Sequence, residues 1–174
     1  MGKVPLDQLA KEKGIEVEWK AFELKPEGEE VPEKSPEYME RARKGVEQLA
    51  AQYGLDMKFN ASTDHSRHAL EGAKYAEEHG KGNEYHDAVF AAQFQQERNI
   101  NDLDVLVEIA GDLGLDQEDF RSELEKRTYQ DAVLQDHAEA VRLGVTGIPC
   151  FVSGNRGVMG AQTYESLKQL VEGE

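Results

Sequence analysis

The sequence predicts an α/β protein in which a few short strands flank a long block of helices. Residues 15–21 alternate between apolar and polar side chains, with β-branched and aromatic residues, which is typical of a half-buried strand. From residue 35 to residue 143 the apolar residues recur at helical spacing. Residues 150–159 contain two short apolar runs around a glycine-rich turn, which predicts two further strands.

Length and charge limit the class of protein. The chain has 174 residues, of which 39% are hydrophobic and 32% charged, so it has the material for one globular domain. Asp and Glu number 35 against 20 Lys and Arg, which gives a net charge of -15. Such a surface repels phosphate backbones and anionic lipids, and no basic stripe offsets it. We therefore expect neither a nucleic-acid partner nor a membrane partner.

Targeting patterns and cysteine content both bear on the compartment of the protein. No apolar run approaches the ~20 residues that cross a bilayer, and the first residues lack the pattern of a signal peptide. We therefore expect a cytoplasmic protein. The one cysteine, Cys150, has no partner in the chain for a disulfide, so cysteine content does not identify the redox compartment.

The N-terminal part predicts a helix, a strand and a loop. Residues 4–13 are expected to be helical, because Pro5 suits the first turn and Gly14 the position after the last. The strand that begins at residue 15 is expected to continue to about Leu24. Residues 25–35, which contain two prolines and a run of glutamates, predict a loop.

The helical block begins with a clear capping signal. Ser35 is expected to cap a helix with Pro36 at its first position, and Gly54 to end it. Asp116 and Thr128 are expected to cap the last two helices of the block. The further helices are expected at residues 64–79, 83–98, 102–113, 117–126 and 129–143.

The C-terminal part predicts a hairpin and a helix. Residues 150–153 form the first strand, 154–157 the turn, 158–159 the second strand and 163–172 the closing helix. The order is therefore helix, strand, helical block, strand, strand and helix. Three strands interrupted by so large a helical block make an incomplete sheet, which indicates that a strand is missing.

Several segments together resemble one family. Residues 144–152, Gly-Val-Thr-Gly-Ile-Pro-Cys-Phe-Val, resemble the cis-proline loop of thioredoxin-fold proteins, and residues 157–162 resemble the strand and helix start that follow it in DsbA-family proteins. Residues 17–26 resemble the second strand and exit loop of the FrnE-like branch of that family. Residues 68–76 and 86–90 resemble parts of its helical insertion.

This resemblance implies a thioredoxin-like α/β fold. The core would be discontinuous, formed by residues 1–34 and 144–174, with residues 35–143 as an all-helical insertion. In the family, the first strand runs into a Cys-x-x-Cys at the start of the first helix. Residues 2–6 look like the segment just after that motif, so we expect this chain to lack the first strand and both catalytic cysteines.

The resemblance also implies a function. We expect DsbA/FrnE-like thiol–disulfide exchange with a cysteine-containing protein or a small thiol, and no cofactor. One alternative is the related glutathione-dependent branch similar to 2-hydroxychromene-2-carboxylate isomerase, in which a serine replaces the first cysteine. The other alternative is a non-catalytic, peptide-binding or chaperone-like protein.

Three adjacent residues are the candidate site. The resemblance implies a cis peptide bond before Pro149 and a substrate-binding role for the backbone of Ile148. Cys150 is either a substitute thiol beside the active site or a small apolar residue packed on a buried strand. Its neighbours Pro149 and Phe151 supply no cation to lower its pKa, so we favour packing.

The histidines do not predict a metal site. His65 and His68 are three residues apart and would share a helix face, but no cysteine or carboxylate stands at a recognisable ligand spacing. His79 is expected at a helix C-terminus, where its charge would favour the helix dipole.

The aromatic residues predict core packing. Tyr85, Phe90 and Phe94 recur at helical spacing, so core packing is favoured over the alternative of a peptide groove. Trp19 lies on the apolar face of the predicted strand and is expected in the core.

A missing central strand has a structural consequence. Residues 15–22 and 150–153 would be its two neighbours, so we expect them not to pair directly with each other. Unpaired strand edges favour association with another chain, and we therefore expect a possible homodimer.

Overall fold

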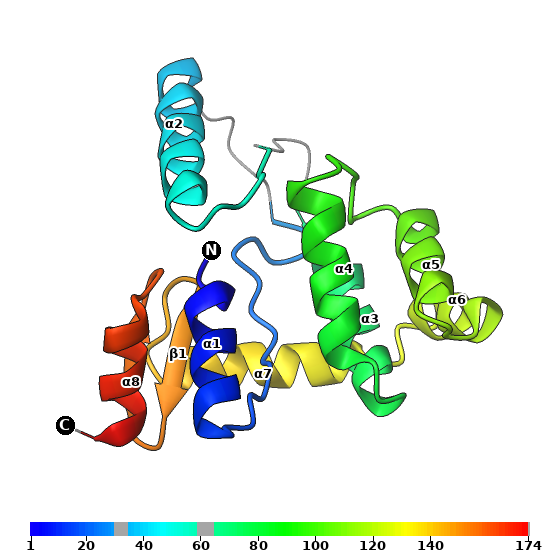
Figure 1. Ribbon diagram of the computed structural model, residues 1–174. Helices are drawn as coiled ribbons and strands as arrows, with labels where there is room; N and C mark the ends of the chain where they lie inside the picture. The colour runs from blue at the N-terminus through cyan, green and yellow to red at the C-terminus, as the bar shows by residue number, and fades with distance from the viewer. Residues whose placement is uncertain (30–34, 59–64, 174) are drawn as a thin grey trace.

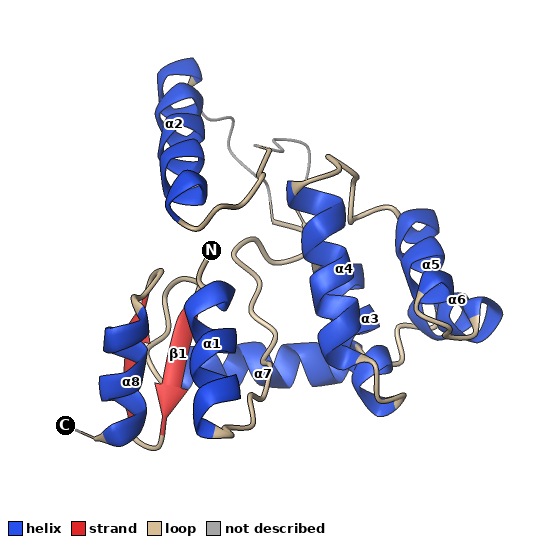
Figure 2. Ribbon diagram, in the orientation of Figure 1, coloured by secondary structure: helices blue, strands red, loops and turns tan. Residues whose placement is uncertain are grey.

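A computed structural model gives the structure of the chain and describes residues 1–29, 35–58 and 65–173. Within these ranges it contains eight helices and one antiparallel sheet of two strands, β1 (Cys150–Ser153) and β2 (Arg156–Met159) (Figure 2). The helices are α1 (Lys3–Lys13), α2 (Pro36–Gln52), α3 (Arg67–Glu78), α4 (Gly82–Phe94), α5 (Leu103–Asp112), α6 (Gln117–Glu125), α7 (Gln130–Arg142) and α8 (Tyr164–Glu172). This is a mixed α/β fold, as predicted.

Local capping signals explain where several helices begin. The Ser35 hydroxyl accepts a hydrogen bond from the Tyr38 N–H at 3.2 Å, with Pro36 in the first turn of α2. The Asp116 carboxylate accepts from the first N–H groups of α6. Both predicted caps are confirmed, because each depends only on residues within one turn.

Other predicted boundaries are wrong. Thr128 does not cap α7, because that helix begins two residues later, at Gln130, without a side-chain cap. α4 ends at Phe94 rather than residue 98, and Glu97 takes a positive φ of 56° that is incompatible with a helix. The predicted helix start at Asp64 and the end of the predicted loop at 30–34 lie outside the described residues.

The hairpin packs with both terminal helices. α1 and α8 lie side by side over one face of β1 and β2 (Figure 1). Leu9, Leu167 and Leu170 are buried between these elements. The Arg156 guanidinium donates to the Leu170 carbonyl at 2.5 Å, which ties β2 to the end of α8. The first and last parts of the chain therefore form one packed unit.

Helices α3 to α7 form a second packed unit, which holds most of the core. α3 lies at its centre and contacts α4, α5, α6 and α7. Gly72 on α3 allows the buried rings of Tyr85 and Phe120 to come close, since a Cβ there would lie 2.3 Å from the Tyr85 hydroxyl. The buried apolar cluster comprises Ala69, Tyr75, Ala76, Tyr85, Val89, Ala92, Ile100, Leu106, Val107, Ile109, Ala110, Phe120 and Leu124.

Helix α2 stands apart from both units (Figure 1). Ala50 is the one residue of this helix that is buried. Although α2 is 17 residues long, neither it nor any other described helix is long and apolar enough to cross a membrane.

The predicted strand over residues 15–24 is wrong. Residues 15–23 run as irregular backbone beside α7, and their side chains still alternate in exposure. The Ala21 N–H donates to the Asp136 carboxylate at 2.9 Å, and the Glu23 N–H donates to the His137 ring at 3.3 Å. Side chains of α7 thus take the place of a neighbouring strand. As predicted, this segment does not pair with β1 among the described residues.

A network of ion pairs fastens the end of this segment to the helices. Buried Glu23 pairs with buried Arg67 at the start of α3. Arg127, in the turn before α7, bridges the fully buried Glu71 at 2.7 Å and Glu27 at 2.9 Å. Such buried carboxylates require a charged partner, so the network determines how the 15–29 segment lies on the helical unit.

Candidate functional site

The predicted site residues lie together on a loop that leads into β1. α7 ends at Arg142, Gly144 turns the chain with a φ of 79°, and the Ile148–Pro149 peptide bond is cis. The Pro149 carbonyl accepts a hydrogen bond from the Gly160 N–H at 2.7 Å, which continues the ladder of the hairpin. Ile148 and Pro149 are exposed, so the backbone of the loop is open to a ligand.

The first turn of α1 approaches this loop closely. A Cβ at Gly2 would lie 3.1 Å from Pro149 Cγ and 3.3 Å from Phe151 Cζ, so only glycine fits without displacing them. Gly2 also caps α1, and no side chain accepts from the first N–H groups of this helix. The Val4 N–H donates to the Met1 carbonyl at 3.2 Å and Pro5 has no N–H, so what lies beside Pro149 is the positive end of the helix dipole, which favours an anion.

Cys150 is half-buried immediately after Pro149. Burial raises the pKa of the Cys150 thiol above its ordinary value. Burial alone causes this shift, and no cation in the described part of the chain lowers the pKa of the thiol in turn. At neutral pH the residue is therefore a thiol rather than the thiolate that attacks disulfides, which agrees with the sequence-based preference for packing.

We expect the rate at which iodoacetamide alkylates Cys150 to go on rising at pH values above the ordinary pKa of a cysteine. The thiolate is the reactive form, and burial delays its appearance. Mass spectrometry of the alkylated chain at several pH values gives the midpoint. The chain unfolded in urea is the control, with a midpoint of about 8.5. A folded midpoint at or below that of the unfolded chain would contradict this prediction.

Side chains of α4 lie next to the first turn of α1. Lys3 pairs with Asp7 at 2.7 Å and with Asp87 of α4 at 3.0 Å, so it joins the two packed units. The neighbouring His86 stacks on Trp19 at 3.9 Å between ring centroids and contacts Phe90 at 4.2 Å. Burial lowers the pKa of His86 to about 4, so this ring is neutral at neutral pH.

The structure corrects the predicted core positions of two aromatic residues, Trp19 and Phe90. Trp19 is only half-buried, and its indole N–H donates to the Asn83 side chain at 2.9 Å, so it lies at the junction of the units rather than in the core. Tyr85 is buried as predicted, but Phe90 is 42% exposed. The sequence carries no signal for the contacts of His86 and Lys3, because each residue meets partners from a segment distant in the sequence.

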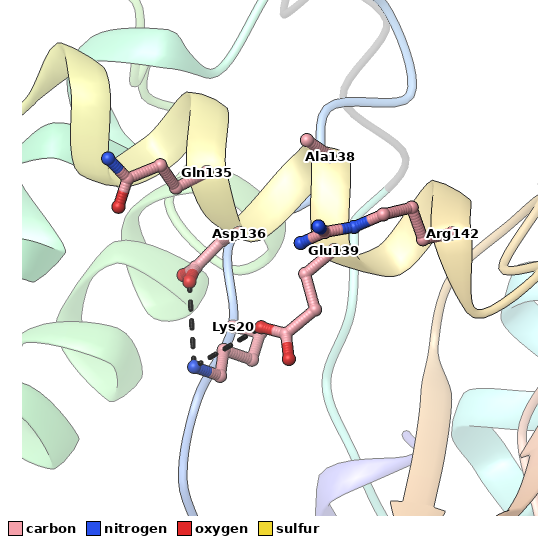
Figure 3. A pocket seen from close by; sticks show the side chains of 6 residues that line it. All are labelled: Lys20, Gln135, Asp136, Ala138, Glu139 and Arg142. Carbon is pink, nitrogen blue, oxygen red and sulfur yellow. Dashed lines mark ion pairs between the residues drawn. The ribbon is translucent and has the colours of Figure 1, made fainter.

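A shallow depression between residues 15–23 and α7 is a structural junction. Figure 3 shows Lys20 reaching toward Asp136 and Glu139 of α7, and each nitrogen–oxygen distance is 3.6 Å. Asp136 also pairs with Lys74 at 2.8 Å. Lys20, Asp136 and Glu139 are thus paired charges, which hold the segment against α7. The residues that line it are Lys20, Gln135, Asp136, Ala138, Glu139 and Arg142.

The described residues contain no cluster of histidine, cysteine or carboxylate side chains that could hold a metal ion. His65 instead contacts the Lys25 carbonyl at 3.3 Å. His79 is the C-cap residue of α3, as predicted, and its ring contacts the Tyr75 carbonyl at 2.8 Å.

Comparison with known proteins places the chain within a family. Residues 1–172 match the family described as the DSBA-like thioredoxin domain. The chain is 34% identical over 181 residues to the uncharacterized protein YwbO of Bacillus subtilis (strain 168), with 100% of this chain and 90% of that protein covered.

Solved structures share the fold. The crystal structure of the probable DsbA oxidoreductase SCO1869 from Streptomyces coelicolor superposes with a TM-score of 0.80 and 32% identity, covering 97% of this chain and 80% of that one. A 2-hydroxychromene-2-carboxylate isomerase superposes with a TM-score of 0.79 over 97% and 84% of the two chains. At 19% identity, this second likeness shows the fold alone.

Proposed function

Because the chain belongs to the family of DSBA-like thioredoxin domains, we propose that it takes part in thiol–disulfide exchange of the DsbA/FrnE type. The substrate would be a cysteine-containing protein or a small thiol, bound at the loop from Ile148 to Cys150. The likeness to a probable DsbA oxidoreductase, at 32% identity over nearly the whole chain, supports this choice of chemistry.

The observation that carries the proposal is the contact between the first turn of α1 and Pro149. This contact places the N-terminus of α1 next to an exposed loop backbone. A sulfur held there would be stabilised as a thiolate by the helix terminus, while the backbone of Ile148 binds an extended segment beside it. The helix terminus that would stabilise a thiolate and the loop backbone that would align a substrate thus lie close together, although the Cys150 thiol itself has a raised pKa.

The single thiol limits what this chain does by itself. The Cys150 thiolate attacks one sulfur of a substrate disulfide, a bond forms between the two, and the other substrate sulfur leaves as a thiolate that takes up a proton. The sequence given has no second cysteine to resolve this mixed disulfide. Release therefore requires an external thiol, and the raised pKa of Cys150 makes the first step slow.

We expect the chain to form a mixed disulfide with oxidised glutathione at alkaline pH but not to catalyse insulin reduction above background. Mass spectrometry detects the mixed disulfide and turbidity detects insulin reduction. The Cys150→Ser variant should lose the adduct completely, whereas the matched variant Ser153→Ala, in the same strand, should keep it.

The outcomes separate the alternatives. Insulin reduction that survives Cys150→Ser would contradict the proposal, because the chemistry would then come from other residues. A folded chain that forms no adduct but binds extended peptides at the loop would favour the non-catalytic alternative. Adduct formation confined to glutathione, with no reaction toward protein disulfides, would favour the glutathione-dependent branch.

A further inference from the structure

Helix α2 presents an apolar stripe that no other helix or strand of the described chain covers. Four apolar residues recur every three or four positions and so share one face of the helix: Tyr38, Ala42, Val46 and Leu49. None of these four side chains is buried, and α2 makes no contact with another described helix or strand. Because helices in proteins are stabilised mainly by packing such a face, the stripe needs a counterpart.

Both ends of α2 are fastened to the unit formed by α3 to α7, and each end has a glycine. Before α2, Glu27 belongs to the network of ion pairs on that unit, and Gly28 follows it with a φ of 87°. After α2, Gly54 has a φ of 63°, and the Lys58 N–H donates to the Phe94 carbonyl at the end of α4 at 2.6 Å. The four residues from Gly54 to Lys58 span about 14 Å at full extension, so the C-terminal end of α2 stays near the end of α4. The helix can therefore turn as a body between two fixed points, whose glycines take up the change in backbone angles.

Exposed apolar side chains lie within reach of the stripe. Phe90 lies one turn before Phe94 on α4, with 5.9 Å between the ring centroids, and is 42% exposed. Ile148 in the candidate loop is 49% exposed. The first turn of α1 bridges α4 and this loop through the contacts of Lys3 and Gly2. Figure 1 shows α2 beyond the end of the molecule at which α1 and β1 begin. With 17 residues, α2 is about 25 Å long, which is enough to extend from the end of α4 toward the loop.

The charges of α2 favour the same approach. Arg41 and Arg43 are the charged residues nearest to the stripe, one on each side, and the acidic residues of α2 lie further round the helix. α2 has three acidic and three basic side chains, whereas the whole chain has a net charge of -15. The stripe and its two arginines are therefore attracted to the acidic body of the chain.

We propose that α2 is a lid that closes over the loop from Ile148 to Cys150, with its apolar stripe against the exposed ring of Phe90. The inference rests on the proposed function, because closure acts on the chemistry only if a substrate occupies this loop. Closure removes the stripe, Phe90 and Ile148 from water, so the hydrophobic effect favours it. A closed lid also covers a mixed disulfide at Cys150, and an external thiol then reaches that disulfide only when the lid opens.

Cross-linking tests the closure without any thiol exchange. Ile148→Cys with Leu49→Cys, in a chain that also carries Cys150→Ser, places one thiol on the loop and one on the stripe. In the matched control, Ala51→Cys replaces Leu49→Cys, because Ala51 is exposed on the opposite face of the same turn. A short bismaleimide joins two thiols only while they are close together, so it traps even a minor closed population. We expect the Leu49 pair to cross-link at least about tenfold faster than the Ala51 pair, as measured by mass spectrometry of the dilute chain.

Two substitutions of Phe90 test whether the lid closes on this ring. Phe90→Ser removes the ring, whereas Phe90→Leu keeps an apolar side chain of similar reach. In the chain with the Leu49 pair, Phe90→Ser should slow cross-linking about tenfold and Phe90→Leu should change it little. Circular dichroism shows that each variant is folded. Equal cross-linking of the Leu49 and Ala51 pairs, cross-linking of neither pair, or a rate that Phe90→Ser leaves unchanged would overturn the proposal.

Release of a mixed disulfide tests the effect of the lid on the site. Leu49→Asp puts a charge on the stripe and should hold the lid open, whereas Ala51→Asp adds the same charge on the opposite face. Dithiothreitol should therefore release glutathione from Cys150 at least about threefold faster in Leu49→Asp than in Ala51→Asp. Equal release from the two variants would contradict the lid and leave the thiol exchange intact. If no glutathione adduct forms, the proposed thiol exchange fails, and the cross-linking rates still decide whether α2 closes.

Discussion

Replacing Arg127 with methionine is expected to lower the free energy of unfolding by about 3–5 kcal/mol. Glu71 is 0% exposed, and Arg127 donates to its carboxylate from Nε at 3.1 Å and from Nη2 at 2.7 Å. Methionine keeps much of the side-chain volume but leaves this carboxylate buried without its cation. Urea denaturation followed by circular dichroism measures the difference.

Two further variants separate the charge from the backbone at this position. Residue 127 has a φ of 61°, in the left-handed region that favours glycine. Arg127→Gly should therefore recover about 1 kcal/mol of backbone strain relative to Arg127→Met while still losing the ion pair. Arg127→Lys keeps a charge and should be the least destabilised of the three. A loss below about 1 kcal/mol for Arg127→Met would show that Glu71 does not depend on Arg127.

Stability is expected to fall between pH 6.5 and pH 4 because of His86. The pKa of His86 is lowered by burial to about 4 in the folded chain, against about 6.5 when unfolded. As the pH falls through this window, the unfolded chain takes up a proton that the folded chain does not, so unfolding is favoured. The contribution is present above pH 6.5 and decreases by up to about 3 kcal/mol by pH 4.

The variant His86→Phe isolates this effect. Phenylalanine keeps a flat ring against Trp19 and Phe90 but has no proton to gain. Carboxylates that titrate in the same window contribute equally to both chains. We therefore expect the stability of the variant relative to wild type to rise by about 2–3 kcal/mol from pH 7 to pH 4. Parallel pH profiles for the two chains, or an NMR titration of the His86 ring with a midpoint near 6.5, would contradict the prediction.

The helices and the hairpin could be predicted because their hydrogen bonds are local. The Ser35 and Asp116 caps and the short turn after Ser153 each involve groups a few residues apart. The errors at Thr128 and at the end of α4 amount to about one turn or less, and neighbouring packing decides whether a helix continues there. The motif from Ile148 to Cys150 was likewise readable, since its residues are consecutive.

The sequence by itself therefore determined the helices, the hairpin and the position of the candidate loop. Only the tertiary structure decided the state of residues 15–23, because a strand exists only where another strand supplies its ladder, and here α7 side chains supply the hydrogen bonds instead. It also decided the contact of Gly2 with Pro149 and the burial of His86 against Trp19. These contacts join residues far apart in the chain, and a side chain's pKa and accessibility follow from such neighbours rather than from residue type.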